Sequence, residues 1–267
     1  MASEDILTLK TSPSPRVLPR IPSIVLWIGA VALAWLVLAH FYRDTMSTLW
    51  AWAPLLAGGL RMNVLISVLA IAIGTVLGAI VGALELSRGR WIGAPAKAYV
   101  QVFRNAPILV LIFFATYVFP FEIRFGSTYL PFPDWIKATI GLALPASAHI
   151  AEIFRGAILS ITSAQWEASA SLGLSRSQTL RWVILPQCVK RVLPPWMNLY
   201  AMITMSTTLA SLVGVTELLE SAKNATNTVN RTDFTIIIYL AVLTLFFLYC
   251  YPITRFTARL ERKYAFH

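Results

Sequence analysis

The chain alternates between long apolar runs and short polar stretches, a pattern typical of helices that cross a lipid bilayer. A helix needs about 20 apolar residues to cross the hydrocarbon core. Six runs meet this requirement, and they cover residues 24–41, 58–86, 99–119, 136–159, 196–215 and 234–253. Backbone groups in hydrocarbon must be satisfied within their own segment, which favours helices. The pattern therefore predicts an all-α membrane protein, a polytopic helical bundle with about six spans.

Positive charge is distributed unevenly between the two ends of these spans. Lys and Arg gather in both tails and in the polar stretch 160–191, and they are sparser in the loops on the other side. The positive-inside rule then places both termini and residues 160–191 in the cytoplasm. An uncleaved first helix is favoured over a cleaved signal peptide, because a long preamble precedes it and no A-x-A-like site follows.

The same pattern predicts the domain organisation. We expect four parts, which are a cytoplasmic N-terminal tail (1–22), an extra transmembrane helix with a periplasmic loop (23–57), the main transmembrane domain (58–255) and a cytoplasmic C-terminal tail (256–267). Within the main domain, a ridge of small residues at every fourth position, Gly74, Gly78 and Gly82, predicts close packing against another helix.

Composition narrows the class of function. The chain is 57% hydrophobic and 13% charged, against about a quarter charged in soluble domains. The net charge of +10 comes without a basic patch that interleaves aromatics, so we expect the lipid bilayer and not nucleic acid as its partner. We find no nucleotide-binding loop, no metal-ligand spacing and no catalytic triad pattern. The chain is therefore expected to be a transport subunit and not an enzyme.

The polar stretch 160–191 has the local signals of two short helices joined by a tight turn. Thr162 with Gln165, and Ser175 with Gln178, fit capping boxes at the helix starts. Gly173 fits the left-handed position that ends a helix. The first helix is rich in Ala and Ser, so another protein could approach its backbone closely. Pro186 is expected to end the second helix.

Within that stretch, Glu167-Ala168-Ser169, Gly173 and Ile184-Leu185-Pro186 resemble the E-A-A-x-x-x-G…I-x-L-P loop of ABC importer permeases. A-E-I-F-R-G at 151–156 and F-R-N-A-P at 103–107 resemble motifs of the polar amino-acid uptake branch. The resemblance implies a type I ABC importer transmembrane domain in the bacterial inner membrane. Its coupling residues would be Glu167, Ala168, Ser169, Gly173, Leu185 and Pro186.

The resemblance also implies partners. A cytoplasmic ABC ATPase dimer would bind ATP and Mg²⁺, so this chain is expected to bind no cofactor itself. A second permease, identical or a sister chain, would complete the pathway, and a periplasmic solute-binding protein would deliver an amino acid or similar solute.

Several polar residues inside the predicted spans are candidates for the solute pathway. They are Glu152, His149, Arg155, Asn198, Thr207 and Thr208. A charge within a span is costly and usually faces the bundle interior or water. Glu152 fits equally well a carboxylate that contacts a solute amine and a structural ion pair with Arg155. His149 is favoured as structural, and the hydroxyls could bond between helices or line a cavity.

The predicted function is thus the permease subunit of an ATP-driven importer of small polar solutes. The alternative is a secondary transporter or channel that works without ATP, supported by Glu152, His149 and Arg155. An integral-membrane enzyme is a weaker rival, because no convergent catalytic set is present.

Overall fold

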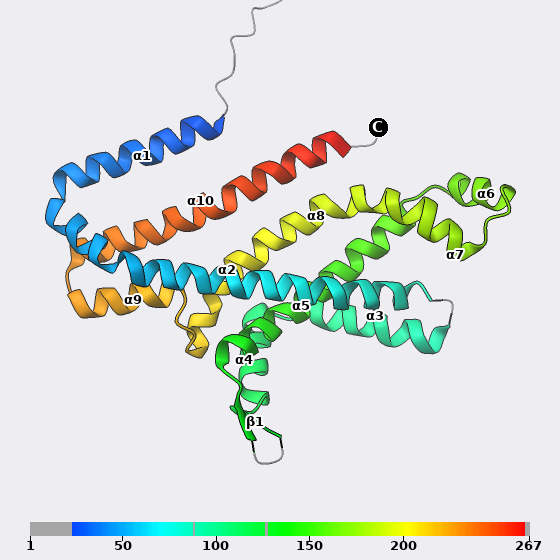
Figure 1. Cartoon of the computed structure of the whole chain (residues 1–267), viewed down its shortest axis with the longest axis horizontal. Coiled ribbons are helices and arrows are strands. Elements are labelled where there is room, and N and C mark those ends of the chain that lie inside the picture. Colours follow the sequence, from blue (N-terminus) through cyan, green and yellow to red (C-terminus); the bar gives the residue numbers. More distant parts are fainter. Residues whose placement is uncertain (1–22, 88, 126–127, 265–267) are drawn as a thin grey trace, which may run out of the picture. The chain divides into compact units, whose positions relative to one another are not determined.

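The computed structural model describes residues 23–87, 89–125 and 128–264, nearly all of them helical (Figure 1). The expected tail 1–22 lies outside the described residues. In chain order the elements are α1 (Ser23–Phe41), α2 (Arg43–Glu85), α3 (Arg90–Asn105), α4 (Ile108–Val118), β1 (Glu122–Phe125), β2 (Thr128–Pro131), α5 (Asp134–Leu159), α6 (Ser163–Ser171), α7 (Arg176–Gln178), the π-helical η1 (Thr179–Ile184), α8 (Leu185–Ser206), the 3₁₀-helical η2 (Thr207–Val213), α9 (Leu218–Val229) and α10 (Thr232–Tyr264).

The chain divides into two compact units, Met1–Met46 and Ser47–His267. The first unit contains the apolar helix α1 and the start of α2. The second contains every residue predicted to act in coupling or transport, and the following description concerns this unit.

The described helices include three that are long and apolar enough to cross a membrane singly: α2, α5 and α10. Two bent pairs qualify as broken spans. The first pair, α3 with α4, bends by 107°, and the second, from Arg176 to Val213 with α9, bends by 48°. The count rises to five if each pair is one span, and α1 is a shorter apolar helix over its residues 28–41. The predicted all-helical bundle is confirmed, but two of its spans are not single helices.

The break between α3 and α4 corrects the prediction of one helix over 99–119. Ala106 takes an extended conformation with ψ of 138°, and Pro107 follows with ψ of 128°. Proline disfavours helical backbone in the residue before it and has no N–H to donate. Hydropathy continues through this point although the helix ends there.

Two predicted loops are helical instead. Residues 43–57, expected to be periplasmic loop, form the first part of the 43-residue helix α2. Asp44 lies in its first turn, where the helix dipole stabilises a negatively charged carboxylate. The polar stretch after residue 217 forms α9, which buries Leu218, Ala222 and Ala225 on one side. The expected C-terminal tail is also helical as far as Tyr264, where α10 ends.

The core of the second unit forms where α2, α4, α5 and α8 meet. Ile66, Ile112, Leu142, Ile150 and Ile203 from these helices are fully buried in it. The cluster fixes α5 in the middle of the unit, so residues on different faces of α5 open onto different surroundings.

The small-residue ridge of α2 lies against α5. A Cβ at Gly74 would come within 2.9 Å of the Ala146 Cβ, and one at Gly78 within 2.6 Å of the Ser147 carbonyl oxygen. At Gly82 it would come within 2.9 Å of the Ala151 carbonyl oxygen. Any larger side chain would therefore separate the two helices.

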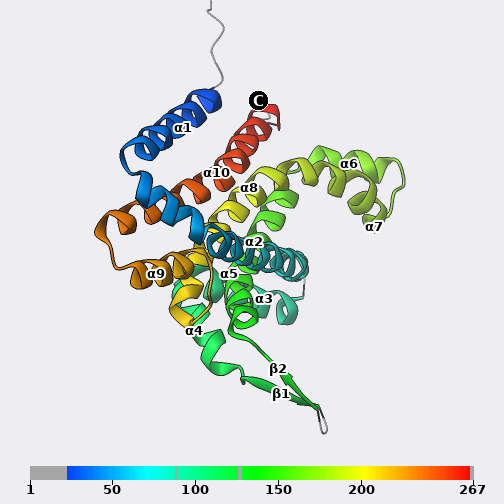
Figure 2. The ribbon, with the colours of Figure 1, turned by 60° about the vertical axis from the view of Figure 1, so that its left-hand side comes forward.

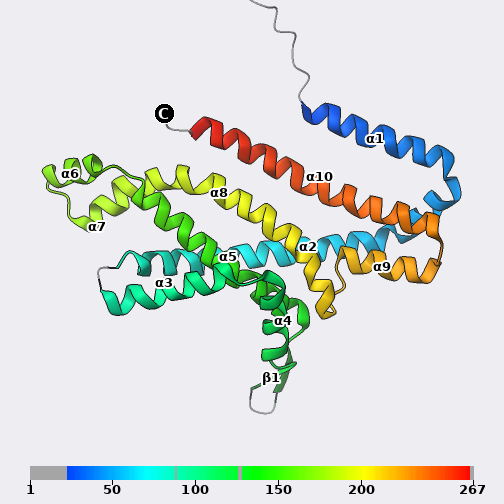
Figure 3. The ribbon, with the colours of Figure 1, turned by 180° about the vertical axis from the view of Figure 1, so that it is seen from behind.

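The ends of the second unit differ in structure. The helices α6 and α7 lie at one end, and α9 lies at the opposite end (Figures 1 and 3). Between α4 and α5 the antiparallel hairpin β1–β2 projects from the helices (Figure 2), with Ile123 paired to Leu130 and Arg124 to Tyr129.

Candidate functional site

The coupling segment, residues 160–191, presents the E-A-S sequence on the short helix α6. Glu167 and Ala168 are exposed to solvent, whereas Ser169 is only 3% exposed. The Ser169 hydroxyl donates to the Gln165 carbonyl at 2.7 Å, which satisfies its buried oxygen within the helix. Two residues of the motif thus face outward, and the third packs inward against the rest of the segment.

A tight turn joins α6 to the next helix. Gly173 has φ of +72°, in the left-handed region that side chains disfavour. The Gly173 N–H donates to the Ala170 carbonyl at 2.9 Å and the Leu174 N–H to the Ser169 carbonyl at 3.1 Å. These two bonds satisfy carbonyls at the end of α6 as in a Schellman motif. The sequence prediction of a left-handed glycine here is confirmed.

One predicted capping box is present and the other is not. The Ser175 hydroxyl accepts from the Gln178 N–H, and the Gln178 side chain accepts from the Ser175 N–H at 2.8 Å. At the start of α6, the Thr162 side chain accepts no capping bond from the described residues. The Gln165 N–H donates to the Thr162 carbonyl at 3.1 Å instead, so the backbone replaces the expected side-chain cap.

Pro186 does not end the second helix, contrary to the sequence prediction. It lies in the first turn of α8, where a missing N–H costs little, and the π-helical η1 precedes it. The helical path from Arg176 therefore continues to Val213. Leu185 and Pro186 are both exposed on this path.

Two hydrogen-bonded links hold the coupling segment together, one between α6 and the start of α8 and one between α8 and the end of α5. Gln187 Nε2 donates to Gln165 Oε1 at 3.2 Å and joins α8 to α6. The Arg191 guanidinium donates to the Ser160 carbonyl and hydroxyl oxygens, both at 2.6 Å, just after α5 ends. A buried apolar cluster beneath them includes Ile184 and Cys188. The helix α6 is thus tied directly to α8, and α8 is tied to the end of α5.

The predicted pathway residues His149, Glu152 and Asn198 lie together. They line a pocket of about 360 Å³ between α5 and α8, which we call the pathway pocket. Its other walls are Ile153, Pro195, Leu199 and Met202. The pocket combines an imidazole, a carboxylate and an amide with apolar walls, a mixture that can orient a small polar solute.

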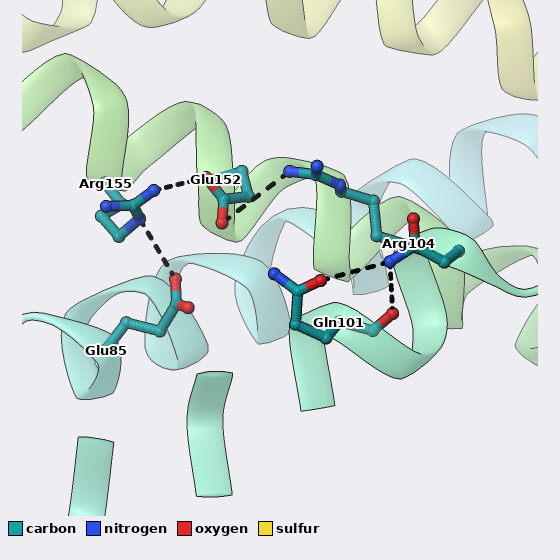
Figure 4. Close-up of polar contacts among 6 residues, drawn as sticks. Glu85, Gln101, Arg104, Glu152 and Arg155 are labelled. Atoms are coloured by element: carbon teal, nitrogen blue, oxygen red, sulfur yellow. Dashed lines mark hydrogen bonds and ion pairs between the residues drawn. The ribbon is translucent and has the colours of Figure 1, made fainter. Parts of the chain in front are cut away.

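A network of ion pairs around Glu152 joins the three helices α2, α3 and α5 (Figure 4). Arg155 NH2 donates to Glu152 Oε2 at 2.8 Å, and Arg155 Nε lies 3.7 Å from Glu85 Oε2 on α2. Arg104 NH1 of α3 lies 3.8 Å from Glu152 Oε1. The structural Glu152–Arg155 pair is thus present, and Glu152 still borders the pathway pocket. Arg155 itself acts as a bridge between the two carboxylates.

Thr207 and Thr208 do not join this pocket, judged by the described residues that line it. Thr208 lines a separate, mostly apolar pocket beside α10. Thr207 is fully buried and accepts from Asn63 Nδ2 at 2.8 Å. Thr207 follows Asn198 by nine residues, about two and a half helical turns, so the two side chains lie on opposite faces of the path.

Sequence reasoning missed the buried polar cluster that surrounds Thr207. Asn63 Nδ2 also donates to Glu217 Oε2 at 2.9 Å, and Asn63 Oδ1 accepts from the Leu218 N–H at 2.9 Å. Glu217 is fully buried and caps α9 by accepting from the Leu219 and Glu220 N–H groups. The isolated Asn63 in an apolar run was the available signal. We call Asn63, Thr207 and Glu217 the Asn63 cluster.

Other chemistry is sparse in the part of the chain that is described. No three His, Cys, Asp or Glu side chains there gather closely enough to hold a metal ion. Cys188 and Cys250 are both buried free thiols. The coupling segment and the pathway pocket are thus the two sites with a recognisable arrangement.

Comparison with known proteins agrees with this arrangement. The chain is 35% identical to a probable amino-acid ABC transporter permease protein, YckA of Bacillus subtilis, over 79% of this chain and 90% of that protein. It is 38% identical to the glutamine transport system permease protein GlnP of Escherichia coli K12, over 64% of this chain and 77% of that one.

A solved structure described as an amino acid ABC transporter with histidines matches with a TM-score of 0.69 at 25% identity. The match covers 80% of this chain and 96% of the solved one. Residues 74–265 match the family described as the binding-protein-dependent transport system inner membrane component. This match spans the ridge, the pathway pocket and the coupling segment, and the chain therefore belongs to that family of membrane transport components.

Proposed function

We propose that the chain is the permease subunit of an ABC importer for amino acids or similar small polar solutes. The observation that carries this proposal is the construction of α6. Its Glu167 and Ala168 face outward while Ser169 anchors the helix, and Gln165 is tied to α8. A capped, tethered helix with an exposed small-residue face suits docking of another protein that has to move it.

The partner on this face would be a dimer of cytoplasmic ATPases, which would bind ATP and Mg²⁺. A second permease, identical or a sister chain, would complete the pathway, and a periplasmic protein would deliver the solute. ATP binding can switch the permease only if the ATP-bound partner favours one permease state over the other. The link from α6 to α8, and the link from α8 to the end of α5, are the route by which this preference would reach the pathway pocket.

The names of the relatives support amino acids as the solute class. They include permease proteins of glutamine and L-cystine transport systems. In this chain the Glu152 carboxylate would face a solute amine, and His149 and Asn198 offer hydrogen bonds nearby. The mixed polar and apolar walls suit a small zwitterion better than an apolar ligand.

We further propose a multi-pass placement in a bacterial inner membrane with both termini cytoplasmic. The basic coupling segment and α9 lie at opposite ends of the second unit, which agrees with the charge bias of the sequence (Figures 1 and 3). The coupling segment would then meet the ATPases and α9 would lie on the periplasmic side.

The test is gentle purification from the native membrane followed by mass spectrometry of what co-purifies. An ATPase in roughly equal amount is expected with the unaltered chain, and Glu167→Lys should strongly reduce it. Glu261→Lys is the matched control, because Glu261 is also exposed and the charge change is the same. If the chain emerges without an ATPase from several mild detergents, a secondary transporter or channel becomes the better description.

A further inference from the structure

A second, larger pocket lies where the membrane-spanning helices meet the coupling segment. Its volume is about 840 Å³, within the range of roughly 300–1,000 Å³ common for ligand sites. Ala79 and Ala83 of α2 and Phe154 and Ile158 of α5 form walls on the side of the spans, and Trp166 of α6 borders it on the side of the coupling segment. We call this the junction pocket.

The chemistry of the junction pocket is that of an amphipathic ligand. Its walls are mainly apolar, with Ser87 as a further polar side chain, and among the described residues that line it Arg176 alone is charged. The Arg176 side chain is exposed, and within the described residues it forms no ion pair with a carboxylate. An apolar cavity with one available guanidinium at its edge suits a molecule with an acyl chain and an anionic head.

The pocket faces away from the pathway. Glu152 and Phe154 are two residues apart on α5, which separates them by about 200° around the helix axis. Glu152 lines the pathway pocket, and Phe154 lines the junction pocket. If the pathway lies at the centre of a permease pair, the opposite face of α5 is directed away from the pathway, toward α2 and the surrounding bilayer. Leu159, also in the lining, is 60% exposed, as expected for a side chain in contact with lipid.

We propose that the junction pocket binds an anionic phospholipid of the cytoplasmic leaflet, with an acyl chain along the pocket walls that α2 and α5 supply and its phosphate on Arg176. This inference rests on the proposed function, because the bilayer side of α5 follows from the position of the pathway. Basic pockets between transmembrane helices on the cytoplasmic side are a recurrent site for such headgroups. Because Trp166 of α6 forms part of the wall, a bound lipid would support the coupling helix.

The experiment uses the complex in the form in which it leaves the membrane, in nanodiscs of phosphatidylcholine. A trace of phosphatidylglycerol with a photoreactive acyl chain is added, and labelled peptides are mapped by mass spectrometry. Matched photoreactive phosphatidylcholine is the comparison. We expect the anionic probe to label the α2 and α5 walls more strongly, and Arg176→Gln to lower this preference about fivefold, the effect of one cationic side chain near anionic lipid.

Two further variants make the result specific. Arg181→Gln removes an exposed arginine that lies five residues after Arg176 and does not line the pocket, and labelling should remain unchanged. Ala83→Phe fills the apolar part and should reduce labelling although Arg176 remains. Equal labelling by the two probes, or an equal loss in both arginine variants, would overturn the proposal. So would a crosslink between Arg176 and an ATPase chain that occupies the pocket.

The lipid measurement is independent of coupling. Labelling is read without ATP, and the amount of co-purified ATPase is read from the same sample. If the unaltered complex retains its ATPase but shows no preferential labelling by the anionic probe, the lipid site is rejected and the permease function stands. If the anionic probe labels the pocket but no ATPase co-purifies, the lipid site stands and the proposed permease function is rejected.

Discussion

At the residue scale, the backbone conformation at position 173, and not a lack of space, is the reason for a glycine there. Its φ of +72° lies in the left-handed region, and apart from the two neighbouring residues no described residue has an atom within 4 Å of where a Cβ would be. A substitution there meets no steric obstacle, so its whole cost is backbone strain, about 1–2 kcal/mol. This separates the turn after α6 from positions where glycine is needed for space.

We therefore predict that Gly173→Ala weakens the turn and lowers solute-stimulated ATP hydrolysis while the chain still inserts and folds. Gly156→Ala is the control, because that glycine is helical and also has free space around its Cβ position. It should be neutral or slightly stabilising. Stimulated ATPase activity of reconstituted complexes is the measurement, and equal effects of the two changes would contradict the prediction.

Arg155 illustrates a residue whose charge is shared. Its guanidinium lies between Glu85, which is nearly buried, and Glu152 (Figure 4). We predict that Arg155→Met destabilises the chain by about 1–3 kcal/mol, because the buried Glu85 loses its ion-pair partner and Glu152 keeps only Arg104. Adding Glu85→Gln should recover part of that loss. Thermal unfolding in detergent measures both, and strictly additive losses would argue against the bridge.

The residues of the site differ in how far sequence could identify them. His149 and Glu152 are three apart on one predicted helix, so a shared face followed from spacing. The polarity of Asn198 within a predicted span made it a candidate, and the packing of α8 on α5 places it beside His149 and Glu152. The Asn63 cluster escaped because its members are far apart in sequence and meet only after α2 packs against the break before α9.

At the element scale, the contact of α2 with α5 depends on the glycine ridge. We predict that Gly78→Ala destabilises the chain by about 1–3 kcal/mol, because its Cβ would collide with the Ser147 carbonyl and the Ile150 side chain. Gly58→Ala on the same helix is the control, since a Cβ there meets nothing closer than Arg61 NH2 at 4.0 Å. A shift in melting temperature for Gly78→Ala but not for Gly58→Ala is the expected result.

Hydropathy predicted helical elements better than it predicted their breaks. The span expected at 136–159 corresponds closely to α5, because a single apolar helix leaves no ambiguity. The bends after Asn105 and Val213 depend on which backbone groups lose their partners, and residue hydropathy does not report this. The helix α9 was missed because its apolar residues form one stripe and not a run, although Leu218, Ala222 and Ala225 have helical spacing.

At the scale of the whole molecule, the opposite ends of the second unit should be reached from opposite sides of the membrane. We predict that a cysteine placed at the exposed Ser177 of α7 reacts with an impermeant thiol reagent from the cytoplasmic side. One placed at the exposed Asn227 of α9 should react from the other side. The native thiols, Cys188 and Cys250, are buried and give a low background. Labelling in right-side-out and inside-out vesicles is the measurement. Reaction of both cysteines from the same side, or of each from the side opposite to the one expected, would contradict the proposed topology.

The continuous helical path from Arg176 to Val213 gives the molecule a mechanical property. It is linked to α6 near one end, and the Asn63 cluster fixes the opposite end to α2, so the path resembles a lever with its fulcrum at the cluster. Asn198 lies nearer the fulcrum. With a constant rise per residue from Thr207, a stroke applied at Arg176 would arrive at Asn198 reduced to about three-tenths, with the force correspondingly increased. Spin-label distances from α2 should accordingly change less at Asn198 than at Ser177 when ATP binds. The coupling end would make a large displacement under a small force, while the wall of the pathway pocket would make a small displacement with a larger force.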